Sequence, residues 1–165
     1  MGKISMSIKK TKQSGFTIVE LLIVIVVIGI LAALVITTFS GVQQKARDTK
    51  RQTDIRALYS MLEAFYAQNG GGYPVLVDFN TASWRTTNMK GLDEGALCDP
   101  SASATTGCAL VSAPAAKSYA YQVWQTDGTT ACTATTGQTC PKYTVTATLE
   151  GTVNGSGTYV KNSLN

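Results

Sequence analysis

The stretch Ser14-Gly15-Phe16-Thr17-Ile18-Val19-Glu20 opens the apolar run that decides the fold. This run extends from Phe16 to Phe39, and Glu20 is its only charged residue. A helix of this length measures roughly 36 Å at about 1.5 Å per residue, which is enough to cross a hydrocarbon core of about 30 Å. Because a backbone in lipid must satisfy its own hydrogen bonds, a single span has to be helical. The alternative is a buried core helix, but the run is too long and is apolar on every face.

Glu20 is expected to be functional, because a carboxylate inside a membrane span costs about 3 kcal/mol or more. The residues before the run are basic and include no acid: Lys3, Lys9, Lys10 and Lys12. We interpret residues 1–15 as a targeting leader that takes no part in the fold. An ordinary secretory signal is the alternative. It would need small residues after the apolar core, whereas Ala32-Ala33 lies in the middle of the run.

A basic leader, a Gly15-Phe16 junction, Glu20 and a long apolar run, in this order, resemble the prepilin signal of the type IV pilin superfamily. Gly29 also matches a glycine common in these stems. The resemblance implies that a prepilin peptidase cleaves between Gly15 and Phe16 and that the new amino group of Phe16 is methylated. It also implies that subunits pack through their stems into a filament, with Glu20 and Phe16 as candidates for setting the register.

The resemblance is strong from Lys9 to Phe39 and weaker as far as Pro74. Many stems of this superfamily carry a proline later in the span, where this chain has Ile36-Thr37-Thr38. We therefore infer no proline kink. Lysines and arginines flank the run on both sides, so the count of positive charges gives no orientation. The leader is placed in the cytoplasm by the resemblance and by the cysteines.

Composition narrows the possible functions of the 165 residues, which allow a membrane segment and one small domain. The formal charge of +4 comes from the leader, because ten basic and ten acidic side chains remain without it. We therefore expect no specific nucleic-acid partner. The chain has no histidine, which excludes Ser-His and Cys-His nucleophiles and imidazole zinc sites. We expect no cofactor, no metal and no enzymatic activity.

The four cysteines, Cys98, Cys108, Cys132 and Cys140, form no C-x-x-C pair, so metal and redox motifs are disfavoured. An even number beyond a membrane span indicates disulfides in an oxidising compartment. Three connectivities are possible. We favour the local pairs Cys98–Cys108 and Cys132–Cys140, because each closes a Ser/Thr/Ala/Gly-rich loop that has little hydrophobic content. Four reduced, buried thiols are the alternative.

The helix is expected to continue beyond the apolar run as an amphipathic outer half. Residues 40–54 are polar, and an apolar stripe with helical spacing follows: Ile55, Leu58, Leu62 and Phe65, widened by Tyr59 and Tyr66. We expect Asp54 and Arg56 on the exposed opposite face. Asn69-Gly70-Gly71-Gly72 predicts the end of the helix at about Gln68.

A long connection from Tyr73 to Ala116 follows, in which the sequence places no regular element, although part of it should be ordered. Asp93, Glu94 and Asp99 in this connection fit a solvated loop better than a metal or acid/base site. Alternation of apolar and polar residues then predicts strands at Ser118–Gln125 and Lys142–Glu150. In the second strand Tyr143, Val145, Ala147 and Leu149 should face inward, with the threonines outward. Asn154-Gly155 predicts a turn into a short last strand, Thr158–Lys161.

The predicted fold class is α+β: a long N-terminal helical stem packed on a small antiparallel sheet, with a long loop between them. The predicted organisation is a cleaved leader (1–15), a membrane or filament-core helix (16–39), the outer half of the stem (40–69) and a disulfide-containing head (70–165). The same architecture is implied by the resemblance to pilins.

The favoured function is a structural subunit, a major pilin of an extracellular type IV pilus, that forms a homo-oligomeric helical filament. Its expected partners are the prepilin peptidase/methylase, the pilus assembly machinery and the cytoplasmic membrane, where the precursor is a single-pass protein with its head outside. Twitching motility, cell adhesion, DNA uptake and host contact are all served by pili with similar stems, and the sequence does not select one of these roles. The alternatives are a pseudopilin of a type II secretion or competence system and a membrane-anchored adhesive module. Major pseudopilins usually carry a C-terminal calcium site, but Glu150 is the only acid here after Asp127.

Overall fold

The computed structural model describes residues 15–102, 108–133, 135 and 137–165. The leader lysines, Lys3, Lys9, Lys10 and Lys12, lie outside these residues. The chain divides into two compact units between Ser40 and Gly41. One helix, α1 (Ile18–Gln68), contributes residues to both units.

The end of α1 lies where the glycines predict it, at Gln68. Gly70 and Gly71 follow with φ of 76° and 90°, a backbone region that side chains other than glycine rarely adopt. The N–H of Gly71 donates to the carbonyl of Tyr66 at 3.2 Å, which satisfies a carbonyl of the last turn. The beginning of α1 is Ile18, two residues after the expected Phe16.

The connection between stem and sheet contains short elements that the sequence did not place. They are β1 (Tyr73–Pro74), α2 (Leu76–Asn80), α3 (Ala82–Asn88) and a 3-10 helix, η1 (Glu94–Leu97). β1 pairs with β3 (Thr139–Cys140) in a two-stranded antiparallel sheet. α2 and α3 have five and seven residues, too few to produce a clear helical periodicity in the sequence.

The main sheet contains β2 (Tyr119–Trp124), β4 (Lys142–Val153) and β5 (Ser156–Asn162), hydrogen-bonded in the order β2-β4-β5. Both pairs are antiparallel, so the predicted antiparallel head is confirmed. β4 and β5 extend beyond their predicted ends, and a register shift lies between Thr148 and Val153. Asn154 and Gly155 have φ of 52° and 79°, as a two-residue hairpin turn requires.

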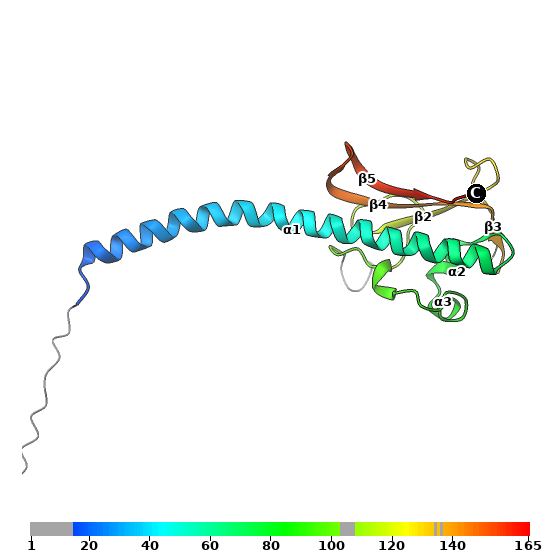
Figure 1. Cartoon of the computed structure of the whole chain (residues 1–165), viewed down its shortest axis with the longest axis horizontal. Helices are drawn as coiled ribbons and strands as arrows, with labels where there is room; N and C mark the ends of the chain where they lie inside the picture. Colours follow the sequence, from blue (N-terminus) through cyan, green and yellow to red (C-terminus); the bar gives the residue numbers. More distant parts are fainter. Residues whose placement is uncertain (1–14, 103–107, 134, 136) are drawn as a thin grey trace, which may run out of the picture. The chain divides into compact units, whose positions relative to one another are not determined.

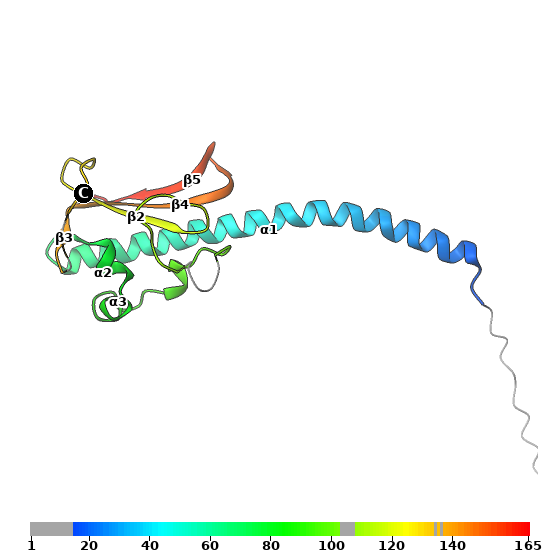
Figure 2. The ribbon, with the colours of Figure 1, turned by 180° about the vertical axis from the view of Figure 1, so that it is seen from behind.

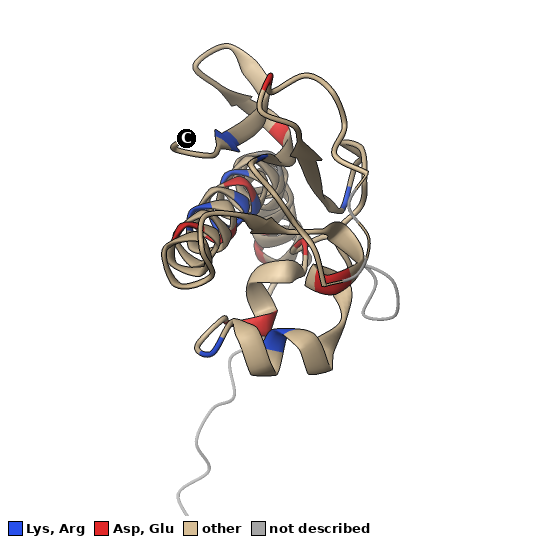
Figure 3. Ribbon diagram, turned by 90° about the vertical axis from the view of Figure 1, so that its right-hand side faces the viewer, with Lys and Arg blue, Asp and Glu red and all other residues tan. Residues whose placement is uncertain are grey.

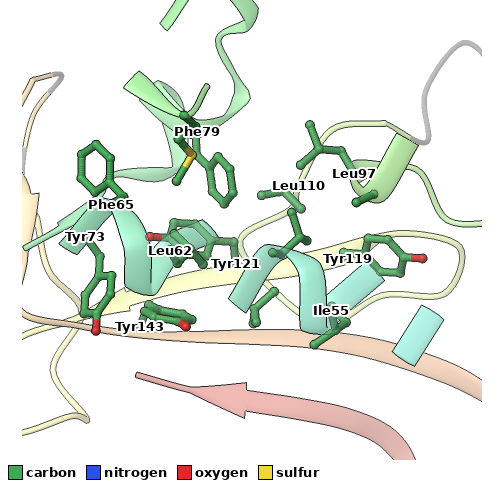
Figure 4. Packing of buried hydrophobic residues seen from close by; sticks show 14 of the residues in the cluster. Ile55, Leu62, Phe65, Tyr73, Phe79, Leu97, Leu110, Tyr119, Tyr121 and Tyr143 are labelled. Carbon is green, nitrogen blue, oxygen red and sulfur yellow. The ribbon is translucent and has the colours of Figure 1, made fainter. Parts of the chain in front are cut away.

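Within the head, the main sheet covers one side of α1, and α2 and α3 cover the other (Figures 1 and 2). The predicted stripe lies between these layers: Ile55, Leu58, Leu62 and Phe65 are all 5% exposed or less. Tyr73, Phe79, Tyr121 and Tyr143 surround it (Figure 4). The rings of Phe79 and Tyr121 meet edge to face at 5.0 Å, and those of Tyr73 and Tyr143 at 4.5 Å. The predicted α+β fold is thus confirmed, with a core made by both layers against one helix.

Three exposure predictions are wrong. Asp54 is 2% exposed, because it accepts a hydrogen bond from the Tyr119 hydroxyl at 2.8 Å and pairs with Lys50. Asp99 is 4% exposed, because it pairs with Arg51. Thr146, expected on the wet face of β4, is 5% exposed because β4 is the central strand. Arg56 is exposed, as expected.

The disulfides in the structure are Cys98–Cys108 and Cys132–Cys140, the two local pairs favoured from the sequence. Cys98 follows η1 and precedes the buried Asp99. Cys140 is the last residue of β3 and is fully buried. Each bridge therefore ties a polar loop to a residue that the core holds in place.

Candidate functional site

The predicted processing junction lies immediately before α1. Gly15, Phe16 and Thr17 have no regular secondary structure and are exposed, and α1 begins one residue later. No heavy atom lies within 4 Å of a Cβ built on Gly15, and the Phe16 side chain is 84% exposed. Among the described residues, this peptide bond is therefore open to a processing enzyme.

Glu20 forms a capping box with Thr17 at the N-terminus of α1. The Thr17 N–H and hydroxyl donate to the Glu20 carboxylate at 2.8 and 2.7 Å, and the Glu20 N–H donates back to the Thr17 hydroxyl at 3.2 Å. This reciprocal arrangement satisfies two backbone donors that the first turn would otherwise leave unpaired. The carboxylate also lies at the positive end of the helix dipole. Within one chain, Glu20 therefore fixes where the helix begins.

The predicted partner of Glu20, the amine of Phe16, does not exist before cleavage. In the uncleaved chain the Phe16 nitrogen belongs to a peptide bond. Cleavage after Gly15 would create a cation four residues before Glu20, on the chain segment that leads into the capping box. A carboxylate that already accepts two hydrogen bonds from Thr17 has a defined position from which it can meet that charge.

The apolar part of α1 has no covering layer within the described residues. Its large side chains between Ile18 and Phe39 are 48 to 83% exposed. A window of this helix has a mean hydropathy of 3.2, and α1 is the one described helix long and apolar enough to span a membrane. Gly29 lies in this segment with no atom within 4 Å of a built Cβ, so another helix can approach its backbone closely.

A buried ion-pair network holds the head on α1. Figure 3 shows charged residues of both signs along the helix ribbon and acidic residues on other segments of the head. Arg51, 2% exposed, donates to Asp99 at 2.7 and 3.0 Å, to Asp48 at 2.7 Å and to Glu150 at 2.9 Å. Its remaining N–H donates to Ser101 at 2.9 Å. All five guanidinium N–H groups therefore have acceptors, drawn from α1, the loop after Cys98, and β4.

The hydrogen bonds of the network shift the pKa values of Glu150 and Arg51 in the directions that ion pairing predicts. Hydrogen bonds from Arg47, and then from Arg51 and Ser101, lower the pKa of Glu150 to about 2, although burial opposes the shift. Hydrogen bonding to Asp99 raises the pKa of Arg51 further above its ordinary value. Asp48 also accepts the backbone N–H groups of Glu150 and Gly151 at 3.0 and 2.9 Å, next to the register shift in β4. The charges thus position the stem-side end of the sheet.

Comparisons with known proteins support the interpretation of the processing junction and the apolar run. A family model described as the prokaryotic N-terminal methylation motif matches residues 10–36. These residues cover the junction, Glu20 and most of the apolar run. The motif implies processing by a prepilin peptidase and handling by an assembly machinery, and with the apolar helix it indicates a membrane-anchored precursor.

Type II secretion system core protein G of Aeromonas hydrophila is 43% identical over 61 residues, which are 37% of this chain and 43% of that protein. The core protein G of Escherichia coli K12 is 43% identical over 58 residues, 35% of this chain and 40% of that protein. Type IV major pilin protein PilA of Myxococcus xanthus DK1622 is 37% identical over 57 residues, 34% of this chain and 26% of that protein. No solved structure matches the chain significantly.

The motif at residues 10–36 and these similarities, which cover about a third of the chain, indicate the pilin and pseudopilin superfamily. The similarity includes both pseudopilins, from type II secretion systems, and a type IV pilin. It spans less than half of each of these relatives.

Two functional features escaped the sequence analysis. Thr17 was visible as the first residue of a T-x-x-E capping box before an apolar run. The Asp99 and Glu150 contacts of Arg51 had no local signal, because these residues are separated from Arg51 by 48 and 99 residues. The polar composition of residues 40–54 is typical of a solvated helix surface. Which of these residues are buried depends on tertiary contacts.

Proposed function

We propose that the chain is the repeating subunit of a helical filament, assembled from a membrane-anchored precursor. The observation that carries this proposal is a processing junction, Gly15-Phe16, followed directly by a Thr17–Glu20 capping box and an exposed apolar helix. A filament core of stems from neighbouring subunits would cover this apolar surface after the chain leaves the membrane. We propose a structural role and no enzymatic one.

Glu20 would act in choosing the register of these stems. Apolar helices slide past one another easily, because lipid-like side chains specify little. The Phe16 amine formed on cleavage stays cationic when it is methylated, as a methylated lysine does. Pairing it with Glu20, on a neighbouring stem or on the same chain, adds little net stability, whereas a buried charge without its partner costs about 3–5 kcal/mol. The pair would thus penalise wrong registers more than it strengthens the right one.

The comparisons support a pseudopilin of a type II secretion-type machine over the major pilin favoured from the sequence. Several relatives named type II secretion system core protein G reach 41–43% identity, compared with 37% for PilA. In this version of the proposal, the filament is periplasmic.

A surface pilus is the second candidate, because the chain has few acids near its C-terminus with which to bind calcium. A major pseudopilin resembling core protein G would be expected to hold calcium through acids near its C-terminus. Here Glu150, the only acid after Asp127, is paired with Arg47 and Arg51. In the described residues, no group of three or more His, Cys, Asp or Glu could hold a metal ion.

The register proposal is tested with Glu20→Ala and Glu20→Gln in the native host. Mass spectrometry of the mature N-terminus should find cleavage after Gly15 and a methylated Phe16 in the wild type. The Glu20 variants should be processed and inserted but should assemble few or no filaments. Thr17→Ala, which removes the cap and keeps the carboxylate, is the matched control and should lose less assembly. Normal filament numbers from Glu20→Ala at equal subunit levels would refute the register proposal.

A deletion of the gene separates the two kinds of filament. Loss of secreted enzymes with no change in surface filaments supports the pseudopilin. Loss of sheared surface filaments that react with an antibody to the head supports the pilin. An intact leader, or cleavage downstream of the apolar run, would refute the filament proposal as a whole.

A further inference from the structure

Among the described residues of the head, Trp124 is the aromatic residue that does not pack in the core. The chain has two tryptophans, and Trp84 packs on Phe65 with ring centroids 5.4 Å apart. Trp124 is half-buried at the end of β2, outside the hydrophobic cluster. In the β2–β4 register it pairs with Lys142, and so it lies on the face of the sheet opposite the buried Tyr121 and Tyr143. Trp124 is thus a half-buried aromatic side chain outside the core, on the opposite face of the sheet.

Trp124 lines a cavity of about 270 Å³ together with Gly128, Lys142, Thr144, Asn162 and Asn165. The cavity is slightly smaller than typical ligand pockets of roughly 300–1,000 Å³, so it suits a single small ring. Gly128 forms one wall: its φ is 72°, and a Cβ built there would lie 3.8 Å from the Lys142 ammonium. The C-terminal residues after β5 form another part of the lining.

A hydrogen-bond relay orients the polar groups of the cavity. The Trp124 indole N–H donates to the Thr144 hydroxyl at 3.0 Å, and that hydroxyl donates to the Asn162 side-chain oxygen at 3.1 Å. The amide oxygen of Asn162 is therefore occupied, and its NH₂ group is the part left to a ligand. Lys142 forms no ion pair with any described carboxylate. The cavity thus places the Trp124 side chain beside two sets of donors that no described group uses, a cation and an amide.

We propose that this cavity binds an acidic sugar unit of a glycan, such as a uronic acid. The apolar C–H face of the ring would stack on the Trp124 indole, and the sugar carboxylate would accept hydrogen bonds from Lys142 and Asn162. A charge-assisted hydrogen bond is roughly twice as strong as a neutral one, which favours an acidic sugar over a neutral one. An acidic peptide side chain would use the cation but would leave the aromatic face and the ring-sized cavity unused. This binding function goes beyond filament assembly and does not depend on it.

The test uses the full chain in detergent micelles with Trp84→Phe as background, so that Trp124 is the only tryptophan and can be excited selectively over the tyrosines. Titration with glucuronic acid should change the Trp124 emission saturably, and glucose should bind at least tenfold more weakly. Lys142→Gln should weaken glucuronate binding at least tenfold. The matched control is Lys161→Gln, which removes a cation from neighbouring β5 on the helix-facing side, where Lys161 lies over Tyr59. It should leave binding unchanged.

Saturation-transfer NMR of glucuronate gives a second readout that does not need the fluorophore. The ring protons should receive magnetisation from the wild-type chain and not from Trp124→Ala. This variant should keep the wild-type far-ultraviolet circular dichroism, because Trp124 is outside the core. Equal responses to acetate and glucuronate would mean a cation site alone and would overturn the proposal. So would unchanged binding by Lys142→Gln, an absence of saturable binding, or tighter binding of an acidic peptide.

Discussion

Replacing Arg51 with methionine should destabilise the head more than any surface change on α1. The substitution keeps most of the side-chain volume and removes five hydrogen bonds of 2.7 to 3.0 Å. It leaves Asp99 and Asp48, 4% and 7% exposed, buried without their cation. Removing one partner of a buried ion pair costs about 3–5 kcal/mol, a large part of the roughly 5–15 kcal/mol that stabilises a typical domain. At this size of domain the melting temperature should fall by about 10–20 °C.

The assay is thermal and urea unfolding of the full chain in detergent micelles, followed by near-ultraviolet circular dichroism of the head tyrosines. Lys45→Met is the matched control, because Lys45 is exposed on the same helix and forms no ion pair with the described carboxylates. Its effect should stay within about 0.5 kcal/mol. The cost of Arg51→Met should shrink at pH 4, because the unpaired carboxylates can then take up protons.

A double-mutant cycle separates two contributions to the lost stability: the cost of burying an unpaired charge and the loss of side-chain packing. Asp99→Asn keeps the acceptor for the Ser101 N–H, which Asp99 binds at 2.8 Å, and removes the charge. Arg51→Met combined with Asp99→Asn should therefore cost about 1–3 kcal/mol less than the sum of the single changes. A loss below about 1 kcal/mol for Arg51→Met, or additive effects in the cycle, would refute the assignment of this network as the anchor of the head.

Three further predictions concern the head. The pKa of Glu150 is lowered from 4.5 to about 2. Its contribution to stability is therefore complete above about pH 4.5 and is lost as the pH falls towards 2. In Glu150→Gln, the melting temperature should depend less on pH in this range than it does in the wild type. Gly72→Ala should destabilise the head by about 1–3 kcal/mol, because the new Cβ would lie 2.2 Å from the Thr139 hydroxyl. Adding Thr139→Gly to this variant removes the clash and should restore its stability to urea. Replacing Cys132 and Cys140 by serine should cost about 2–3 kcal/mol relative to the oxidised wild type in urea unfolding. The reduced wild type, in which both disulfides are open, should lose at least as much.

The sequence by itself determined the features that depend on local order along the chain. The junction, Glu20 and the apolar run are contiguous, so their spacing is readable without a structure. The stripe Ile55, Leu58, Leu62 and Phe65 followed from the period of one helix, and the strands followed from alternation. Each of these patterns arises because a single helix or strand has one face in a single environment. The pattern can therefore be read from residues that are close together in the sequence.

Only the tertiary structure decided which polar residues became interior. Asp54 and Asp99 have the same local surroundings as exposed acids. They are buried because Tyr119 and Arg51, 65 and 48 residues away, supply the hydrogen bonds that offset the cost of desolvation. The cavity at Trp124 likewise requires β2, β4 and the C-terminal residues to meet. A buried polar group is stable only when it has a hydrogen-bonding or charged partner. When that partner is distant along the chain, no local sequence pattern indicates that the group is buried.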